Sequence, residues 1–243
     1  FYALFQPKID ISTGRPYGCE MLARWDHPRL GLISPDKFIP IMERENMIAE
    51  MTQSVFEKYL PQLKRLLDSH PDFKISINVS PLNLLDTSLL DNLEVSMQVN
   101  GFKASGLIIE VTENAIMSNP LRSARVLQKF SEAGIGVSVD DFGTGYSSLA
   151  YLQKFPISEL KIDKSFIIGL NKNSQNYPIV NATITMAHDL GMSVIAEGVE
   201  DMEVIDLLVE MKCYLVQGRF FAEPLSLEEL EDWIEHFEIT DFR

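Results

Sequence analysis

Short apolar runs and longer amphipathic segments alternate along the whole chain. Eight runs rich in β-branched and other apolar residues have the length of strands, and the segments between and after them carry apolar residues at three-to-four spacing. The expected strands span residues 2–7, 18–25, 74–80, 107–113, 136–141, 159–163, 193–199 and 213–218. The expected helices span residues 35–46, 49–69, 88–99, 120–133, 147–154, 174–190, 202–211 and 227–237. This alternation favours a parallel sheet that is covered by helices.

The number of strand and helix units predicts the fold class. A chain of 243 residues has the length of one TIM-type barrel, which takes roughly 250 residues. We therefore expect an α/β fold, a (β/α)8 barrel in which one strand is free to run antiparallel, with an open doubly wound sheet as the alternative. No internal repeat or low-complexity linker interrupts the chain, so residues 1–243 are expected to form one domain.

Polar residues stand at the ends of the expected strands, within otherwise apolar runs. They are Glu20, Asn78, Glu110, Asp140, Asp141, Lys161, Asp163, Glu197 and Gln217. One acidic residue at a strand end is more often a helix cap or a salt-bridge partner. In a barrel, however, the C-terminal ends of all strands meet on one face, where active sites of this fold lie. The set as a whole therefore predicts a functional site.

The carboxylates of this set point to metal ions. Buried carboxylates are costly unless protons, hydrogen-bond donors or cations compensate them. Oxygen ligands without His or Cys favour Mg²⁺ or Mn²⁺ over zinc. Two adjacent carboxylates, Asp140 and Asp141, are able to serve two ions, which is the arrangement used for phosphodiester hydrolysis.

Composition narrows the class of partner. A net charge of −14 argues against a nucleic acid polymer as ligand, because such binding relies on Lys and Arg. No apolar run approaches the roughly 20 residues of a membrane span, so we expect no membrane contact by this domain. Cys19 and Cys213 lie in apolar runs, which predicts buried free thiols and a cytoplasmic setting. The start at Phe1 without a Met suggests the C-terminal part of a longer protein.

Ordered motifs along nearly the whole chain resemble the EAL family of cyclic di-GMP phosphodiesterases. The motifs are Phe5-Gln6-Pro7, Glu20-Met21-Leu22-Ala23-Arg24-Trp25, His27-Pro28, Phe38-Ile39-Pro40, Asn78-Val79-Ser80, Glu110-Val111-Thr112-Glu113, Asp140-Asp141-Phe142-Gly143-Thr144-Gly145-Tyr146-Ser147-Ser148-Leu149, Lys161-Ile162-Asp163, Ala196-Glu197-Gly198-Val199-Glu200 and Gln217-Gly218. The resemblance implies hydrolysis of cyclic di-GMP to linear pGpG in bacterial second-messenger signalling, with two Mg²⁺ or Mn²⁺ ions as cofactors.

The resemblance also implies roles for individual residues. The first metal would be held by Glu20, Asn78, Glu110 and Asp140, and the second by Asp140, Asp141 and Glu197. Catalytic roles would fall to Lys161, at the attacking water or the scissile phosphate, to Glu197 as the candidate base, and to Glu20. Contacts to the substrate would come from Gln6, Leu22, Arg24, Asp163 and Gln217.

A glycine-containing loop would couple dimerisation to activity in such a protein. Its residues are Phe142, Gly143, Thr144, Gly145, Tyr146 and Ser147, with Glu113 bracing them. The family further implies a homodimer formed through residues 147–154 and 174–190, and sensory or diguanylate cyclase (GGDEF-type) domains upstream.

Two departures from the family pattern stand out. Met21 replaces the usual alanine of the signature, and Arg219 stands where an aromatic residue is more common. Because side chains alternate along a strand, Met21 should point away from Glu20 and toward the helical layer. The rival interpretations are a cyclic di-GMP receptor without turnover and an unrelated barrel hydrolase. A site built from His188-Asp189 is not expected, since the other histidines lie in unrelated segments.

Overall fold

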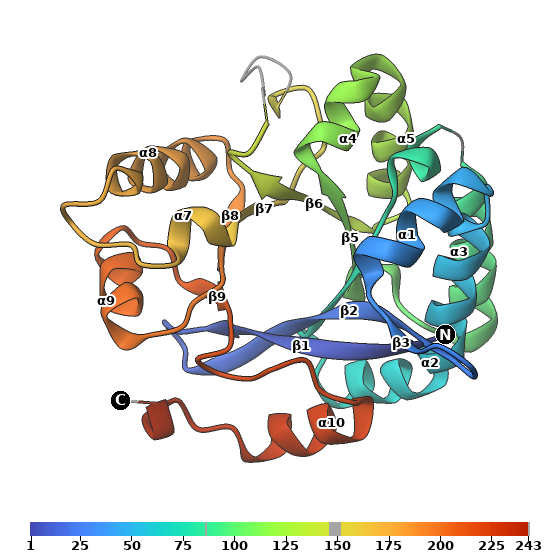
Figure 1. Ribbon diagram of the computed structural model, residues 1–243, viewed down its shortest axis with the longest axis horizontal. Coiled ribbons are helices and arrows are strands. Elements are labelled where there is room, and N and C mark those ends of the chain that lie inside the picture. Colours follow the sequence, from blue (N-terminus) through green and yellow to red (C-terminus); the bar gives the residue numbers. More distant parts are fainter. Residues whose placement is uncertain (86, 146–151, 243) are drawn as a thin grey trace.

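The computed structural model describes residues 1–85, 87–145 and 152–242 and shows a closed barrel of eight strands surrounded by helices (Figure 1). The strands are β1 (Tyr2–Asp10), β2 (Arg15–His27), β3 (Gly31–Ile33), β4 (Lys74–Asn78), β5 (Leu107–Thr112), β6 (Gly136–Phe142), β7 (Glu159–Ile162), β8 (Ser193–Glu197) and β9 (Leu215–Gln217). Their order is β1-β9-β8-β7-β6-β5-β4-β2-β3, and pairing of β1 with β2 closes the ring. The predicted TIM-type barrel is confirmed.

The helices form an outer layer around this ring (Figure 1). They are α1 (Pro35–Arg44), α2 (Ile48–Ser69), α3 (Ser88–Asn100), α4 (Glu113–Ser118), α5 (Pro120–Glu132), α7 (Lys164–Ile167), α8 (Asn176–Asp189), α9 (Met202–Glu210) and α10 (Leu227–His236). Short 3-10 segments span Pro81–Leu84, Ala104–Gly106 and Ile239–Phe242. In the described part of the chain, no helix is both long and apolar enough to cross a membrane.

One strand of the barrel, β1, runs antiparallel to both of its neighbours, β2 and β9. The remaining neighbours in the ring are parallel. The reason is local, because β1 and β2 follow one another through a short turn with Gly14 at φ 68°, and a parallel pair would need a long crossover. β3 pairs with β2, antiparallel, and adds a hairpin outside the ring.

The barrel strands are buried on both faces, so their sequences read as nearly continuous apolar runs. Ile109 and Val111 of β5 are completely buried toward one side, and Glu110 between them points to the other. The helices cover the outer face with amphipathic stripes, as in α2, whose Leu60 and Leu63 are fully buried. The polar side chains at alternate strand positions, such as that of Glu110, therefore point into the lumen of the barrel.

Some boundaries differ from the sequence-based expectation. Glu113 was expected to end a strand, but it begins α4, because the Thr112 side chain caps that helix by accepting from the amide of Ala115. Asp163 likewise follows β7 and caps α7, a helix that the sequence pattern did not predict. The helix expected at residues 147–154 lies largely outside the described residues.

Candidate metal centre and active site

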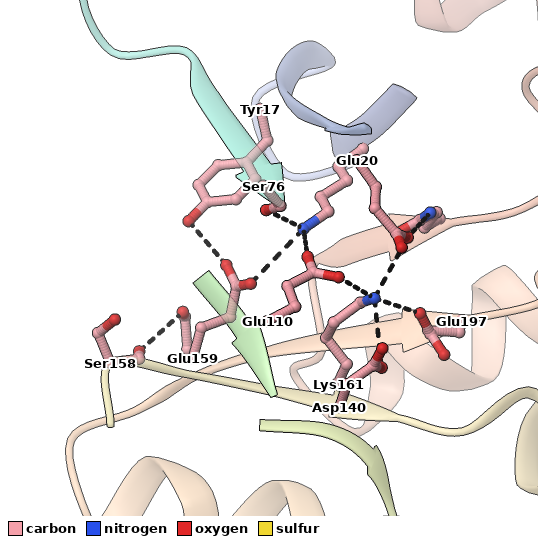
Figure 2. A network of polar contacts seen from close by, with 12 residues as sticks. Tyr17, Glu20, Ser76, Glu110, Asp140, Ser158, Glu159, Lys161 and Glu197 are labelled. Atoms are coloured by element: carbon pink, nitrogen blue, oxygen red, sulfur yellow. Dashed lines mark hydrogen bonds and ion pairs between the residues drawn. The ribbon is translucent and has the colours of Figure 1, made fainter. Parts of the chain in front are cut away.

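The ammonium group of Lys161 lies at the centre of the site at the C-terminal end of the barrel. The side chain extends from β7, is completely buried, and forms ion pairs with carboxylates from four other strands. Its Nζ lies 3.3 Å from Glu20, 2.6 Å from Glu110, 3.2 Å from Asp140 and 2.7 Å from Glu197. Figure 2 shows these four carboxylates directed at the same nitrogen. The strand-end residues predicted from the sequence therefore do converge.

Glu20 of β2 is held in place by three donors. Its Oε1 accepts a 2.6 Å hydrogen bond from Asn78, and its Oε2 accepts one of 2.9 Å from Gln217 in addition to the Lys161 contact. Gln217 also donates to Gln6 over 3.1 Å, while its own buried Oε1 has no hydrogen-bond partner among the described residues. These contacts fix the carboxylate of Glu20 on the lumen face.

Asp140 and Asp141 both reach the site although consecutive residues of a strand normally point to opposite faces. The register between β6 and β7 shifts between Val139 and Phe142, and Asp141 has a φ of 54°. A non-glycine residue in the left-handed region is uncommon and often marks a functional site. This irregularity gives adjacent carboxylates to one site.

The carboxylate oxygens form two groups, each compact enough to hold one ion. Glu20, Glu110 and Asp140 offer oxygens within 4.8 Å of one another, and so do Asp140, Asp141 and Glu197. Asp140 belongs to both groups, and among the described residues neither group contains His or Cys. An all-oxygen donor set suits a hard divalent cation such as Mg²⁺ or Mn²⁺. The geometry therefore fits a two-ion site with one shared carboxylate.

The pKa values of these acids reflect their burial and the charges around them. Burial raises the pKa of Asp140 to about 6 and that of Glu197 to about 8, against the attraction of Lys161. Burial also raises the pKa of Asp141. For Glu110, the attraction of Lys161 and Lys8 outweighs burial and lowers the pKa to about 2. A bound cation would relieve the unfavourable repulsion that the carboxylates of Asp140 and Glu197 experience.

A cleft of about 320 Å³ opens above these groups and is lined by Gln6, Glu20, Asp141, Asp163, Lys164, Glu197, Gln217 and Arg219 among others. The Asp163 carboxylate accepts from the amide of Ser165 over 3.0 Å, so it caps α7 as well as lining the cleft. Leu22 and Arg24 line a separate, mostly apolar cavity of about 250 Å³ beside Asn78. The guanidinium of Arg24 donates to the carbonyl oxygen of Ala23 over 3.0 Å.

Met21 takes the position expected from strand alternation. Its side chain is buried and lines the cavity between β2, β4 and the helices α1 and α2. Glu20, one residue earlier, faces the lumen. The long side chain at this signature position therefore lies on the opposite side of the strand from the carboxylate cluster.

Glu113 lies beneath the glycine-containing loop. Its buried carboxylate accepts from the amide of Gly143 over 2.9 Å and from that of Gly145 over 3.3 Å. A Cβ atom at Gly145 would come within 2.9 Å of this carboxylate, so the close approach requires glycine. Phe142 is buried and Thr144 donates to the carbonyl oxygen of Asp141 over 2.8 Å. Tyr146 and Ser147 lie outside the described residues.

Three further residues near the site were not assigned a role from the sequence. Lys8 and Glu159 are completely buried in the lumen below Glu110 and form an ion pair of 3.6 Å. Each lies two residues before or after a residue already placed in the lumen, Gln6 or Lys161, so strand alternation was the available signal. Arg219 pairs with Glu200 over 3.0 Å at the rim of the cleft.

Comparison with known proteins places these features in a family. The EAL domain model matches residues 1–224. Cyclic di-GMP phosphodiesterase NbdA of Pseudomonas aeruginosa is 38% identical over 231 residues, which cover 95% of this chain and 30% of that protein. A structure described as PaMucR phosphodiesterase in complex with c-di-GMP superimposes with a TM-score of 0.88 at 37% identity, covering 94% of this chain and 93% of that one.

A second solved structure, an EAL domain protein from Listeria monocytogenes, superimposes with a TM-score of 0.81 at 31% identity and covers 96% of this chain and 92% of that one. The chain spans only 30%, 33% and 40% of the length of three curated relatives. The family match extends from β1 to the segment before α10 and includes every residue of the carboxylate cluster. The chain therefore belongs to the EAL domain family.

Proposed function

We propose that this domain is a metal-dependent phosphodiesterase that hydrolyses cyclic di-GMP to linear pGpG. The observation that carries the proposal is the sharing of Asp140 between two carboxylate groups beside the buried ammonium of Lys161. Relatives that are named cyclic di-GMP phosphodiesterases, and the c-di-GMP complex of a similar structure, support the substrate.

The two carboxylate groups support the following metal ligands. Glu20, Asn78, Glu110 and Asp140 would hold one ion, and Asp140, Asp141 and Glu197 the other. When bound, two divalent cations supply Lewis-acid activation of water and neutralise charge on the phosphate.

The remaining chemistry falls to side chains of this chain. Lys161 carries its positive charge in a dry environment, since burial lowers its pKa but the surrounding carboxylates raise it well above the usual value. An ammonium group so placed stabilises negative charge that develops on phosphate oxygens. Glu197, at 2.7 Å from Lys161 and on the cleft wall, is positioned to exchange a proton with the attacking water.

The substrate would lie in the cleft with its phosphates over the cluster. Gln6, Gln217 and Asp163 line this cleft, and the two glutamines would supply hydrogen bonds to the substrate. Leu22 and Arg24 line the separate, mostly apolar cavity beside Asn78, and the guanidinium of Arg24 would contact a phosphate of the substrate.

Larger assemblies are part of the same proposal. A homodimer would use α8, which exposes Ile179, together with residues 147–154, most of which lie outside the described part of the chain. The chain spans only part of the length of its curated relatives, one of which is named a bifunctional diguanylate cyclase/cyclic di-GMP phosphodiesterase. This partial coverage supports the presence of upstream domains of sensory or GGDEF type. We expect a cytoplasmic setting, where the buried thiols of Cys19 and Cys213 stay reduced.

The test is turnover of cyclic di-GMP with Mg²⁺ or Mn²⁺, followed by chromatography of the product. We expect linear pGpG, complete loss of turnover with a chelator, and loss of at least about 100-fold in Glu20→Gln. Glu210→Gln, at an exposed carboxylate that pairs with Lys172, is the matched control and should keep full activity. Binding of cyclic di-GMP without turnover, with either metal and at concentrations that permit dimers, would instead identify a receptor.

A further inference from the structure

A second lysine, Lys8, supports the carboxylate cluster from inside the barrel. Its side chain is completely buried and donates to Ser76 over 2.7 Å and to Glu110 over 2.5 Å. Glu159 lies 3.6 Å from the same nitrogen. The lysine thus lies one layer below the site and is not among the residues that line the cleft.

Lys8 and Lys161 divide the two oxygens of Glu110 between them. Oε1 of Glu110 accepts from Lys8, and Oε2 lies 2.6 Å from Lys161. Lys161, which contacts the second oxygen, also pairs with Glu20 and Asp140, and Glu110 forms one of the two compact groups with these two acids. One oxygen of this carboxylate is therefore occupied by Lys8 and the other lies toward Lys161.

The polar chain continues toward the other end of the barrel. The second oxygen of Glu159 accepts a 3.1 Å hydrogen bond from the hydroxyl of Tyr17. Figure 2 shows Tyr17, Glu159 and Glu110 one after another across the lumen, with Lys161 and its carboxylate partners beyond Glu110. The ion pair of Lys8 and Glu159 thus has fixed partners on both sides.

Stability alone is a weak reason for such a pair. Removing two charges from water costs about as much as their attraction returns, and apolar residues of similar volume are often as stable. Groups that orient metal-binding side chains, by contrast, commonly determine metal affinity. The position of Lys8 directly behind Glu110 agrees with the second role.

We propose that Lys8 is a positioning residue of the metal site, which holds Glu110 with one oxygen free for the ion while Glu159 balances its charge. This inference rests on the proposed function, because it requires that Glu110 is a metal ligand. An ammonium group near a cation also repels it, but the carboxylate of Glu110 lies between the two and screens this repulsion. The loss of orientation is therefore expected to outweigh the relief of repulsion.

The decisive variant is the double substitution Lys8→Met with Glu159→Gln, which removes the ion pair without leaving a buried charge unpaired. Titration calorimetry with Mn²⁺ should show binding at least about 10-fold weaker than in the wild-type domain. Glu159→Gln alone, which keeps Lys8 on Glu110, should lose less affinity. Lys172→Met, at an exposed lysine that also pairs with a glutamate, is the matched control and should bind Mn²⁺ as the wild type does.

Thermal unfolding in a chelator separates positioning from folding. We expect the single variant Lys8→Met to melt below the double variant, because its Glu159 is left buried and unpaired. A double variant that melts lower than the wild type but binds Mn²⁺ equally well, or more tightly, would overturn the inference. If the wild-type domain binds no Mn²⁺ at all, the proposed function fails, and this inference with it.

Discussion

The ammonium of Lys161 lies 2.7 Å from Oε1 of Glu197. The two residues are 36 positions apart in the sequence, but they lie on the neighbouring parallel strands β7 and β8. The contact brings a fixed positive charge to the carboxylate at the cleft wall. Because Lys161 makes similar contacts to three other acids, its charge keeps the cluster compact in the absence of metal ions.

Replacement of Lys161 by methionine tests this role. Without the ammonium, four carboxylates face one another in a buried site, so the metal-free protein should lose about 3–5 kcal/mol of unfolding free energy. Turnover should fall by about 10²–10³-fold. Urea unfolding in a chelator and initial-rate assays with Mg²⁺ would measure the two effects. Stability equal to that of the wild type would contradict the central position of this charge.

The metal-free domain should become less stable as the pH rises. The native state raises the pKa of Asp140 from 3.8 to about 6 and that of Glu197 from 4.5 to about 8, so it binds protons more tightly than the unfolded chain does. Stability is therefore lost between the ordinary and the raised values, up to about pH 8. Glu110 acts in the opposite direction, since its pKa is lowered to about 2 and its contribution is lost in acid.

Thermal melts in a chelator across this pH range would measure the trend. We expect the highest melting temperature near about pH 4 and a decline from there toward pH 8 or so. Saturating Mg²⁺ should reduce the decline, because a bound cation favours the ionised carboxylates. A melting temperature that rises steadily from pH 5 to pH 8 without metal would show that ionisation of Asp140 and Glu197 does not destabilise the native state.

Substitution of Met21 by alanine should separate stability from activity. The side chain is buried against the helical layer and lines an existing cavity, so we expect a loss of about 2–3 kcal/mol, at the low end for such a truncation. Because Met21 points away from the carboxylate cluster, kcat should stay within about threefold of the wild type. Urea unfolding and turnover assays would test both points. A large gain in activity would show instead that the thioether restrains the site.

The loop contact of Glu113 predicts a graded effect on turnover. Glu113→Ala removes the acceptor of the Gly143 and Gly145 amides and should lower kcat by about 10-fold or more. Glu113→Gln keeps one acceptor oxygen and should lose less. Steady-state kinetics at saturating metal would compare the two variants, with KM reported separately. Equal losses in both would indicate that the charge, not the hydrogen bonds to the loop, is what matters.

Much of the candidate site follows from strand alternation and position. Glu20, Glu110 and Lys161 interrupt the apolar runs of strands, and a barrel brings alternate positions of its strands into one lumen. The same alternation places Met21 behind the sheet, as the structure shows. The sequence did not predict that Asp163 also caps α7, because this helix is too short to show a periodic pattern.

The sequence by itself predicted the barrel and the oxygen-rich character of the strand-end cluster, since these depend on period, length and residue type. Only the tertiary structure decided which oxygen meets which nitrogen. The register break at Asp140 and Asp141, the division of Glu110 between Lys8 and Lys161, and the separate cavity of Arg24 all arise from pairing between distant strands. Such contacts depend on strand register and on burial across the lumen, which local periodicity does not specify.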